Sequence, residues 1–528
     1  MKNVPKWTVF EATLEGFRSH SNPFWDVTLY VHFTSPSGKR QTVEAFWDGS
    51  GVEGGDIWRV RFSPGEVGEW QWTSECAEDA QLNGFAGRFQ CIPYNGDNPL
   101  YSHGPVRLAE NHRHFAWGTA DADIPFFWLA DTAWNGVLRA YEVDWDSYLQ
   151  ARREQGFTVI QFVSTQWRGG QAVLDGETAF DGTSQITLHP EFFQKRDAKV
   201  AAINDHGLIA APVMLWGFWE SDPGQSLAEA DAIRLGRYLA ARWGAYQVIW
   251  LLGGDGHYEG EQAERWRRIG VAVFGPEKER LVTMHPCGQS WGGAEFRGQS
   301  WFDFIGYQSG HGSSEEHLRW LVQGPPATDW ATEPILPVVN LEPNYELHPS
   351  YHGSQVFGDY EVRRAAYWSL LVTPPAGVTY GNNPIWTWTL DALPVVPEGH
   401  AYLGTVAPWH TGVDTPGIRS ISLMKQFFER LPWWQLEPAP DLLSEQPGDA
   451  DPARFIAAAK TADGTCAVIY IPRGGNVCLD TSSLVHPAVE HWFDPRTGQW
   501  MEAGPIAGTT CTLTSPEEQD WVLCIYGK

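Results

Sequence analysis

Eight apolar runs alternate with helical patterns between about residues 120 and 390, and this alternation constrains the fold more than any other feature of the chain. Each run is bounded by Gly or Pro, and helical periodicity fills the segments between runs. Such alternation is typical of repeated βα units that build a parallel sheet. We expect strands over residues 125–134, 157–167, 208–217, 247–255, 281–286, 302–309, 335–343 and 377–381.

The number and length of these units select one α/β architecture. The region is close in length to the ~250 residues of a (β/α)8 TIM barrel, which also requires eight strands. A doubly wound open sheet is the alternative, but its G-x-G-x-x-G turn is missing from the sequence. The expected helices cover residues 144–154, 190–205, 227–243, 260–273 and 361–371, with one more near 418–431 that completes the barrel.

Short runs with period-two alternation flank this region on both sides. Residues 25–33, 42–47, 57–62 and 69–73 alternate in this way, and so do 465–471, 491–493, 499–502 and 521–526. Alternating strands separated by turns indicate antiparallel sandwiches. We therefore predict three domains: an N-terminal β-sandwich over residues 1–94, a (β/α)8 barrel catalytic domain over 95–437 and a C-terminal β-sandwich over 438–528.

Charge and composition exclude several classes of partner. The chain has 37 Lys and Arg against 64 Asp and Glu, a net charge of −27, which would repel a nucleic-acid backbone. No window approaches the ~18 apolar residues of a membrane span, so we expect no membrane contact. The first residues lack the apolar segment of a secretory leader, which predicts a cytoplasmic protein, or a secreted one if a leader was removed.

Cysteine and tryptophan differ in what they indicate. The seven cysteines form no C-x-x-C pair, so neither a zinc site nor a dense disulfide framework is expected, although one or two disulfides stay open.

The 29 tryptophans are an unusual number. Flat aromatic rings stack on the C–H faces of sugars, although rings also fill sandwich cores. Because the chain combines this tryptophan content with an acidic, Gly-rich composition, we expect its partner to be a carbohydrate.

Two carboxylates stand directly after buried strands. Asp255 follows residues 249–254 and Glu342 follows residues 336–341, so both should project over the mouth of the barrel, where active sites of this fold lie. Glycoside hydrolysis needs such a pair: one group protonates the leaving oxygen, and the other attacks the anomeric carbon or activates water. Glu346 is the rival second carboxylate, and Glu220 is a weaker candidate.

The remaining polar and aromatic residues at strand ends are predicted to bind substrate. Asp131 would bind a sugar hydroxyl or orient a neighbour. No H-E-x-x-H or similar ligand spacing occurs among the histidines, so we expect no metal and no cofactor. The predicted aromatic walls are Trp134, Trp167, Trp216, Tyr307, Tyr345 and Trp386, and the predicted hydroxyl-binding residues are His257, His285, Gln308 and Asn383.

Three motifs in order resemble one known family. They are F-W-L-A-D-T-A-W at 127–134, W-L-L-G-G-D at 250–255 and N-L-E-P-N-Y-E at 340–346, and together they resemble the apiosidase-like (β/α)8-barrel glycoside hydrolases. That family commonly has a β-sandwich before the barrel and a β-domain labelled collagen-binding after it. The resemblance implies that Asp255 is the general acid/base and Glu342 the nucleophile or the base partner.

These observations predict a glycoside hydrolase that releases a terminal sugar from a plant-derived oligosaccharide or a small glycoside. The plant origin comes from the resemblance alone, and the missing leader favours small imported substrates over intact polymers. The main alternative is a non-catalytic glycan-binding or scaffold protein. A lyase or phosphorylase built on the same barrel is a further, less favoured alternative. A homo-oligomer also stays open, because the two sandwiches could bind glycan, cap the barrel or join copies of the chain.

Overall fold

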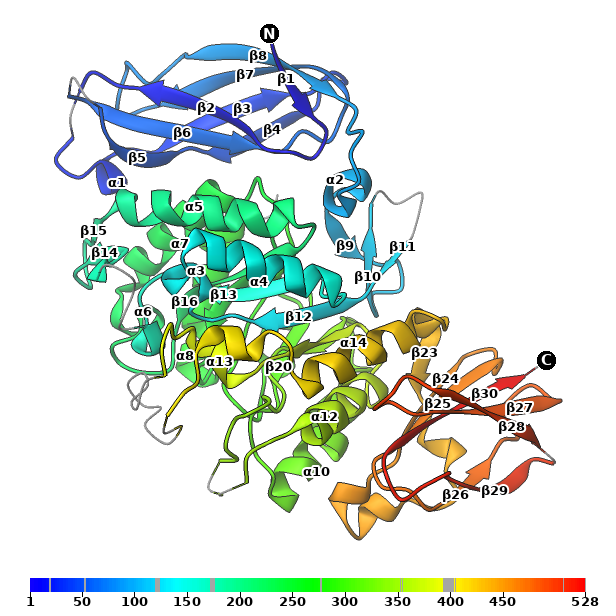
Figure 1. Ribbon diagram of the computed structural model, residues 1–528. Helices are drawn as coiled ribbons and strands as arrows, with labels where there is room; N and C mark the ends of the chain where they lie inside the picture. Colours follow the sequence, from blue (N-terminus) through cyan, green and yellow to red (C-terminus); the bar gives the residue numbers. More distant parts are fainter. Residues whose placement is uncertain are drawn as a thin grey trace.

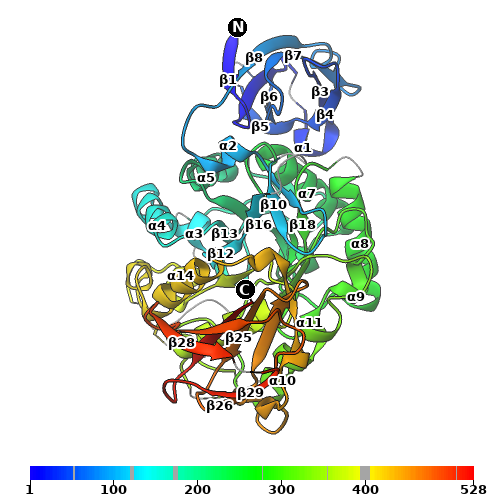
Figure 2. The same cartoon turned by 90° about the vertical axis from the view of Figure 1, so that its right-hand side faces the viewer.

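The chain forms three bodies: a β-rich one near each terminus and a larger α/β body between them (Figure 1). The computed structural model describes residues 1–18, 20–51, 54–118, 124–170, 176–275, 278–351, 353, 355–392, 403, 405–506 and 508–527. The C-terminal body lies against a different side of the central one from the N-terminal body (Figure 2).

Two antiparallel layers make up the N-terminal body. One sheet has the order β1 (Lys2–Pro5), β8 (Ala86–Ile92), β7 (Gly68–Cys76), β3 (Leu29–Thr34) and β4 (Arg40–Glu44), in which β1 alone is parallel to its neighbour. The other has the order β2 (Phe10–Glu15), β6 (Asp56–Phe62) and β5 (Phe46–Ser50). Phe33 stacks on Phe62 at 4.1 Å between the layers. A sandwich is thus present, with its inward residues packed together.

Two of the expected N-terminal strands are divided differently. Residues 23–26 form the helical turn α1 (Pro23–Asp26) with Pro23 in its first turn, so β3 begins only at Leu29. Proline fixes a backbone angle that suits a helix start, and this overrides the alternating pattern there. The run 42–47 belongs to two strands, β4 and β5, which lie in different sheets.

In the described part of the central body, eight parallel strands lie at the eight expected places. They are β12 (Trp128–Thr132), β13 (Val159–Val163), β16 (Ile209–Trp216), β17 (Trp250–Gly254), β18 (Val282–Thr283), β20 (Ile305–Gln308), β21 (Val338–Asn340) and β22 (Gly377–Tyr380). Each of these strands pairs with the next along the chain except β18 with β20, and β22 returns to pair with β12. Between the β18 and β20 segments the structure has a backbone hydrogen bond instead of a ladder, from Asp303 N–H to Val282 O at 2.9 Å. The sheet is therefore curled and barrel-like.

Helices surround this curled sheet (Figure 2). The apolar core is one continuous cluster that joins strands to helices. The helices are α3 (Gly136–Arg139), α4 (Glu142–Glu154), α5 (Pro190–Asp205), α6 (Pro223–Ser226), α7 (Glu229–Trp243), α8 (Gly260–Phe274), α9 (Gly293–Phe296), α10 (Glu315–Gln323), α11 (Pro325–Thr328), α12 (Asp359–Leu371), α13 (Asn383–Thr387) and α14 (Pro416–Phe428). Before the sheet come α2 (Pro99–His103) and the strands β9 (Val106–Leu108), β10 (Phe115–Trp117) and β11 (Ile124–Phe126); β14 (Phe180–Asp181), β15 (Thr187–Leu188) and β19 (Ser290–Trp291) are short additions.

The C-terminal body is again a pair of sheets. Its larger sheet has the order β23 (Leu436–Pro438), β24 (Ala457–Thr461), β25 (Cys466–Ile471), β30 (Trp521–Gly527), β27 (Ala488–Phe493) and β28 (Trp500–Ile506), and the smaller sheet pairs β26 (Asn476–Asp480) with β29 (Thr510–Thr514). Every residue of β25 is buried. One face of this strand contributes to the central core and the other to the core of its own body, which explains its continuous apolar sequence.

Buried ion pairs join each outer body to the centre. Arg61 of β6 binds Asp197 of α5 at 2.7 Å, and Arg242 of α7 binds Asp48 of β5 at 2.8 Å. At the other interface Arg363 of α12 makes two contacts with Asp520, of 2.7 and 2.9 Å. Since removal of one partner would leave a buried charge, these pairs restrict how the bodies pack.

Two expectations from composition have structural counterparts. All seven cysteines lie within the described residues, and each is a free thiol, so the disulfides left open by the sequence do not form in this structure. Among the described helices, none combines the length and the apolar character that crossing a bilayer would require.

Candidate active site

A cavity of about 440 Å³ opens where the strands of the curled sheet end. Asp255 enters it directly after β17, and Glu342 enters it two residues after β21. The cavity brings together nine of the residues predicted from the sequence: Trp134, Trp167, Trp216, Asp255, His257, Gln308, Glu342, Tyr345 and Trp386.

Asp255 and Glu342 face each other across a buried imidazole. His285 lies between them, with Nδ1 3.7 Å from Asp255 Oδ1 and Nε2 3.4 Å from Glu342 Oε2. One oxygen of each carboxyl and one nitrogen of His285 all lie within 4.8 Å of one another. The nearest oxygens of the two carboxyls are thus no more than 4.8 Å apart, whereas the carboxyls are ~5–5.5 Å apart in retaining glycosidases and ~6.5–9.5 Å apart in inverting ones.

The two carboxyls are driven toward opposite protonation states. Burial and the nearby Glu342 raise the pKa of Asp255 to about 6, although Arg168 and His285 oppose the rise. Burial would also raise the pKa of Glu342, but contacts with His285 and His311 outweigh it and lower that pKa below its usual range. In weakly acidic solution Asp255 therefore holds a proton while Glu342 is ionised, the division of roles that acid-assisted displacement needs.

His311 holds Glu342 in place as a neutral donor. The backbone N–H of Tyr345 donates to His311 Nδ1 at 3.3 Å, so this nitrogen must be the unprotonated one in the neutral ring. The proton then resides on Nε2, which donates to Glu342 Oε1 at 2.9 Å. The other carboxylate oxygen, Oε2, has no hydrogen bond within the described residues.

Arg168 supplies the positive charge beside Asp255. Its Nη2 lies 3.4 Å from Asp255 Oδ2, and its Nη1 lies 3.2 Å from the buried carboxylate of Asp222. The guanidinium also lies over the ring of Phe218 at 4.7 Å. Because Asp222 neutralises much of this charge, Arg168 limits the rise in the pKa of Asp255 without abolishing it.

Tryptophans form the inner wall of the cavity. Trp167 lies 4.4 Å from Trp216 and 6.5 Å from Trp386, and Trp134 contacts Trp216 at 5.2 Å. All four rings are largely buried, and the indole N–H of Trp216 has no hydrogen-bond partner in the described part of the chain. Flat apolar faces next to an unused donor suit a sugar ring with its hydroxyls.

Asp131 is placed away from the cavity. Its carboxylate accepts hydrogen bonds from Tyr148 at 2.6 Å and from Arg152 at 2.5 Å, and all three side chains are fully buried. The sequence predicted that Asp131 binds a sugar hydroxyl or orients a neighbour. The geometry contradicts the sugar contact, because a buried guanidinium and a phenol already occupy the carboxylate, which instead fixes Tyr148 and Arg152 in place.

Three more predicted residues lie behind the cavity wall. Tyr307 packs between Trp291 and Trp320 instead of facing the substrate space. Asn383 accepts a hydrogen bond from the indole of Trp386 at 3.0 Å and so orients that ring. His285 is fully buried between the two carboxyls and does not line the cavity. These positions correct the prediction of direct sugar contacts for Tyr307, Asn383 and His285.

The rival carboxylates are also outside the cavity. Glu346 accepts hydrogen bonds from Tyr380 at 2.6 Å, Thr415 at 2.5 Å and the backbone of Gly417 at 2.9 Å, so its carboxylate is fully engaged in packing. Glu220 is exposed and does not line the cavity. Of the carboxylates weighed from the sequence, only Asp255 and Glu342 face each other.

Several lining residues were not among the predicted set. Phe218, Trp219 and Tyr351 form a partly exposed rim, and Arg168 and Cys287 lie deeper. Burial raises the pKa of the Cys287 thiol to about 11, so it is neutral. The aromatic residues of the rim come after strand ends, and this position in the sequence could have been used to predict them. The Cys287 contact with His257, at 3.2 Å, joins loops that no local pattern relates.

Asp255 and Glu342 in the cavity, together with His285 behind its wall, form a cluster that could hold a metal ion. Asp255, His285 and Glu342 each offer one ligand atom within the 4.8 Å cluster, and both ring nitrogens of His285 lack hydrogen bonds in the described structure. Two carboxylates and one imidazole are common ligands of divalent cations. The expectation that no metal is bound therefore remains a prediction to be tested.

Comparison with family models identifies all three bodies. Residues 109–435 match the model "Apiosidase-like, catalytic domain". Residues 3–77 match a domain of unknown function, and residues 438–526 match "Putative collagen-binding domain of a collagenase". The resemblance drawn from the three sequence motifs is thereby confirmed.

Solved structures with the same fold are glycoside hydrolases by description. A "Glycoside hydrolase" has a TM-score of 0.70 with 22% identity, over 82% of this chain and 99% of the other. A glycoside hydrolase family 5 protein from Bacteroides vulgatus has a TM-score of 0.71 with 20% identity, over 82% and 95%. A "putative glycoside hydrolase" from the same organism has a TM-score of 0.72 with 16% identity, over the whole of both chains.

At these identities the structural similarity establishes the fold, and the family match carries the assignment. A search of curated proteins finds no match. The catalytic-domain model covers more than half of the chain, including the motifs around Asp255 and Glu342. The chain therefore belongs to the apiosidase-like family and is a glycoside hydrolase.

Proposed function

We propose that this protein is a retaining glycosidase in which Asp255 is the general acid/base and Glu342 the nucleophile. The observation that carries the proposal is the close, oppositely protonated carboxyl pair within one aromatic cavity. A short carboxyl separation favours direct attack by Glu342, since a water molecule between the carboxyls would need a wider gap.

The reaction would take two steps. In the first, Glu342 Oε2 attacks the anomeric carbon while Asp255 gives its proton to the leaving oxygen, which yields a glycosyl ester of Glu342 and the free aglycone alcohol. In the second, ionised Asp255 takes a proton from water, whose oxygen attacks the same carbon and releases the sugar and the Glu342 carboxylate. Each step inverts the anomeric carbon, so the product keeps the configuration of the substrate.

The substrate would be a terminal sugar on a small glycoside or plant-derived oligosaccharide. The cavity of about 440 Å³ is near the lower end of ligand pockets, which span ~300–1,000 Å³, and so suits a short glycan better than a long chain. The buried tryptophans would hold the terminal ring. Phe218 and Trp219, exposed by 42% and 39%, would contact the leaving group on the Asp255 side.

We also infer that the curled sheet is a (β/α)8 barrel within a catalytic domain at residues 95–437, between sandwiches at 1–94 and 438–528. The cyclic order of the eight strands and the backbone hydrogen bond between the β18 and β20 segments support a closed barrel. Separate apolar clusters in the two outer bodies support the domain borders.

The proposed function can be tested with a panel of aryl glycosides and plant di- and oligosaccharides. Chromatography then measures the sugar that is released from each. We expect the wild type to release a terminal monosaccharide, and Glu342→Gln to lose at least ~10³-fold of that activity, because it removes the nucleophile. Glu220→Gln, an exposed carboxylate outside the cavity, is the matched control and should keep wild-type rates.

The outcomes separate the alternatives. Full activity of Glu342→Gln would remove that residue from the mechanism. Glycan binding by both variants without any release would favour the non-catalytic binding role. Loss of activity after treatment with a chelator would overturn the prediction of a metal-free reaction.

A further inference from the structure

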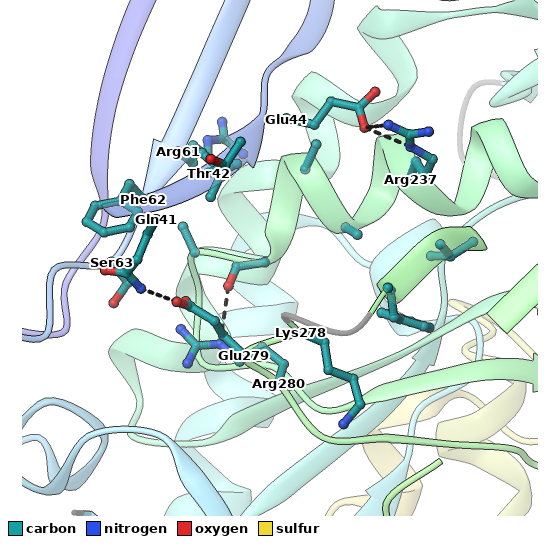
Figure 3. A pocket seen from close by; sticks show the side chains of 18 of the residues that line it. Gln41, Thr42, Glu44, Arg61, Phe62, Ser63, Arg237, Lys278, Glu279 and Arg280 are labelled. Carbon is teal, nitrogen blue, oxygen red and sulfur yellow. Dashed lines mark hydrogen bonds and ion pairs between the residues drawn. The ribbon is translucent and has the colours of Figure 1, made fainter. Parts of the chain in front are cut away.

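A second cleft, of about 720 Å³, lies between the N-terminal body and the central body (Figure 3). One wall comes from β4 and β6, and the other from α7, α8 and the segment before β18. Trp250, the first residue of β17, lines this cleft, whereas Asp255, just past the last, lines the active-site cavity. The two spaces therefore lie at opposite ends of the strands.

The lining of this cleft is cationic in a chain with a net charge of −27. Six Lys and Arg side chains line it, against two carboxylates, Glu44 and Glu279. Glu44 is paired with Arg237, and Glu279 binds the amide of Gln41 across the cleft (Figure 3). The cationic residues are Lys39, Arg40, Arg61, Arg237, Lys278 and Arg280.

Three of the cations are neutralised by the protein and three are not. Arg61 binds Asp197, Arg237 binds Glu44, and Lys278 binds Asp303. Within the described structure no carboxylate pairs with the other three: Lys39, Arg40 and Arg280.

Arg280 is the unusual member, because its side chain is buried. The residue is only 8% exposed, and its one hydrogen bond in the described structure is donated from Nε to Gly244 O at 3.2 Å, at the end of α7. Three other buried guanidiniums, those of Arg152, Arg242 and Arg363, each bind a carboxylate. A buried cation without a counter-charge is costly to fold, so a ligand anion would stabilise it.

A second buried polar group points to the same space. Ser63 is 8% exposed, lines the cleft, and its hydroxyl has no hydrogen-bond partner among the described residues. Ser63 and Arg280 thus offer an unused hydroxyl and unused guanidinium N–H groups from opposite walls. Lys39 and Arg40 add exposed positive charge at the edge.

We propose that this interdomain cleft binds a small ligand that carries an oxyanion group, through Arg280 and Ser63, with Lys39 and Arg40 attracting it. The planar guanidinium binds carboxylate, sulfate or phosphate oxygens through paired N–H groups. The ligand is either an acidic oligosaccharide, whose uronate carboxylates carry the charge, or a phosphate-type anion. The site is independent of the hydrolytic reaction, because it lies at the other end of the strands.

Isothermal titration calorimetry of the full chain at low ionic strength tests the proposal, with trigalacturonate and inorganic phosphate as separate probes. We expect at least one probe to bind, with affinity that falls as salt is added. Arg280→Gln should weaken it by about tenfold or more, and Lys39→Gln and Ser63→Ala by a few-fold each. Arg430→Gln, which removes an exposed arginine elsewhere, is the charge-matched control and should bind as the wild type does.

The two probes also distinguish the sources of the charge. Binding of trigalacturonate alone would assign the site to an acidic glycan, and binding of phosphate to a phosphate-type ligand. Binding of neither probe, or binding that Arg280→Gln and Lys39→Gln leave unchanged, would overturn the proposal. Ser63 makes no hydrogen bond that its alanine variant could lose, so Ser63→Ala stays informative if Arg280→Gln fails to fold. Hydrolysis of a small glycoside should be the same in all four variants.

Discussion

At the scale of single residues, the central feature is that two neighbouring carboxyls respond to different surroundings. Asp255 is affected mainly by burial and by the charge of Glu342, whereas Glu342 receives a hydrogen bond from His311 and lies against His285. Identical chemical groups thereby acquire different protonation states, as acid catalysis beside a nucleophile requires.

This difference predicts how activity depends on pH. In the proposed mechanism Asp255 is protonated in the first step, so kcat/KM should be high below its pKa of about 6 and fall as pH rises through that value. Arg168→Gln removes a cation that lowers this pKa, so the alkaline limb should move to higher pH. A pH–rate profile measures both, with Arg430→Gln as control. An unmoved limb in Arg168→Gln would exclude coupling between Arg168 and the acid.

The same pKa shift predicts an effect on stability. The pKa of Asp255 in the folded protein is about 6, above its usual 3.8, so the unfolded chain binds fewer protons between these values and stability falls as pH rises through them. Asp255→Asn removes this buried charge. We expect the variant to gain thermal stability relative to wild type at pH 8 and to gain little or none at pH 4. Equal Tm differences at both pH values would contradict the assignment.

At the scale of elements, the site depends on loops that follow the strands and are tied to one another. Asp222 is fully buried and accepts hydrogen bonds from the backbones of Phe218, Trp219 and Arg168, at 3.2, 2.8 and 2.9 Å. One carboxylate therefore connects the loop after β16, which forms the rim, with the loop after β13, which carries the arginine.

We expect Asp222→Ala to loosen both loops. KM for glycosides with large leaving groups should rise by roughly tenfold, since all three backbone hydrogen bonds to this carboxylate, each worth ~1.5–3 kcal/mol, are lost and the rim is no longer held in place. Trp219→Ala should raise KM for the same substrates while leaving methyl glycosides nearly unaffected. Steady-state kinetics on a matched pair of aryl and methyl glycosides measures this. Equal effects on both substrates would argue against contact between the rim and the leaving group.

At the scale of the whole molecule, the C-terminal body is joined to the central one through a buried contact. Arg363 and Asp520 bind each other with two hydrogen bonds, and Tyr367 stacks on Tyr470 at 4.7 Å beside them. The apolar core also continues from α12 into the larger C-terminal sheet. The two bodies should therefore unfold together.

Asp520→Ala should destabilise this interface strongly. It leaves the guanidinium of Arg363 buried without its main counter-charge, at a cost of roughly 3–5 kcal/mol in the free energy of unfolding. Asp414→Ala, which breaks an exposed pair with Arg419, should change little. Denaturant unfolding measures both variants. A small loss in Asp520→Ala would show that apolar packing alone holds the interface.

The arrangement of strands could be predicted from the sequence, because it is recorded in local patterns. All eight parallel strands lie where apolar runs bounded by Gly or Pro predicted them, and the expected helices begin within a few residues of their observed starts. Several strands of the outer bodies were not among the expected runs, and two of the expected N-terminal runs differ from the structure, at residues 23–26 and 42–47. There a proline and a change of sheet, neither of which alters the alternation of apolar residues, decided the outcome.

The site was predictable only in part, for a physical reason. Asp255 and Glu342 could be singled out because each follows a buried strand, and parallel strands bring their ends to one edge. The sequence alone determined this much. The tertiary structure decided three further points: whether Asp131 faces sugar or Arg152, whether Tyr307 faces the cavity, and which carboxyl holds the proton. Those outcomes depend on burial and on charges contributed by distant segments, which no local pattern records.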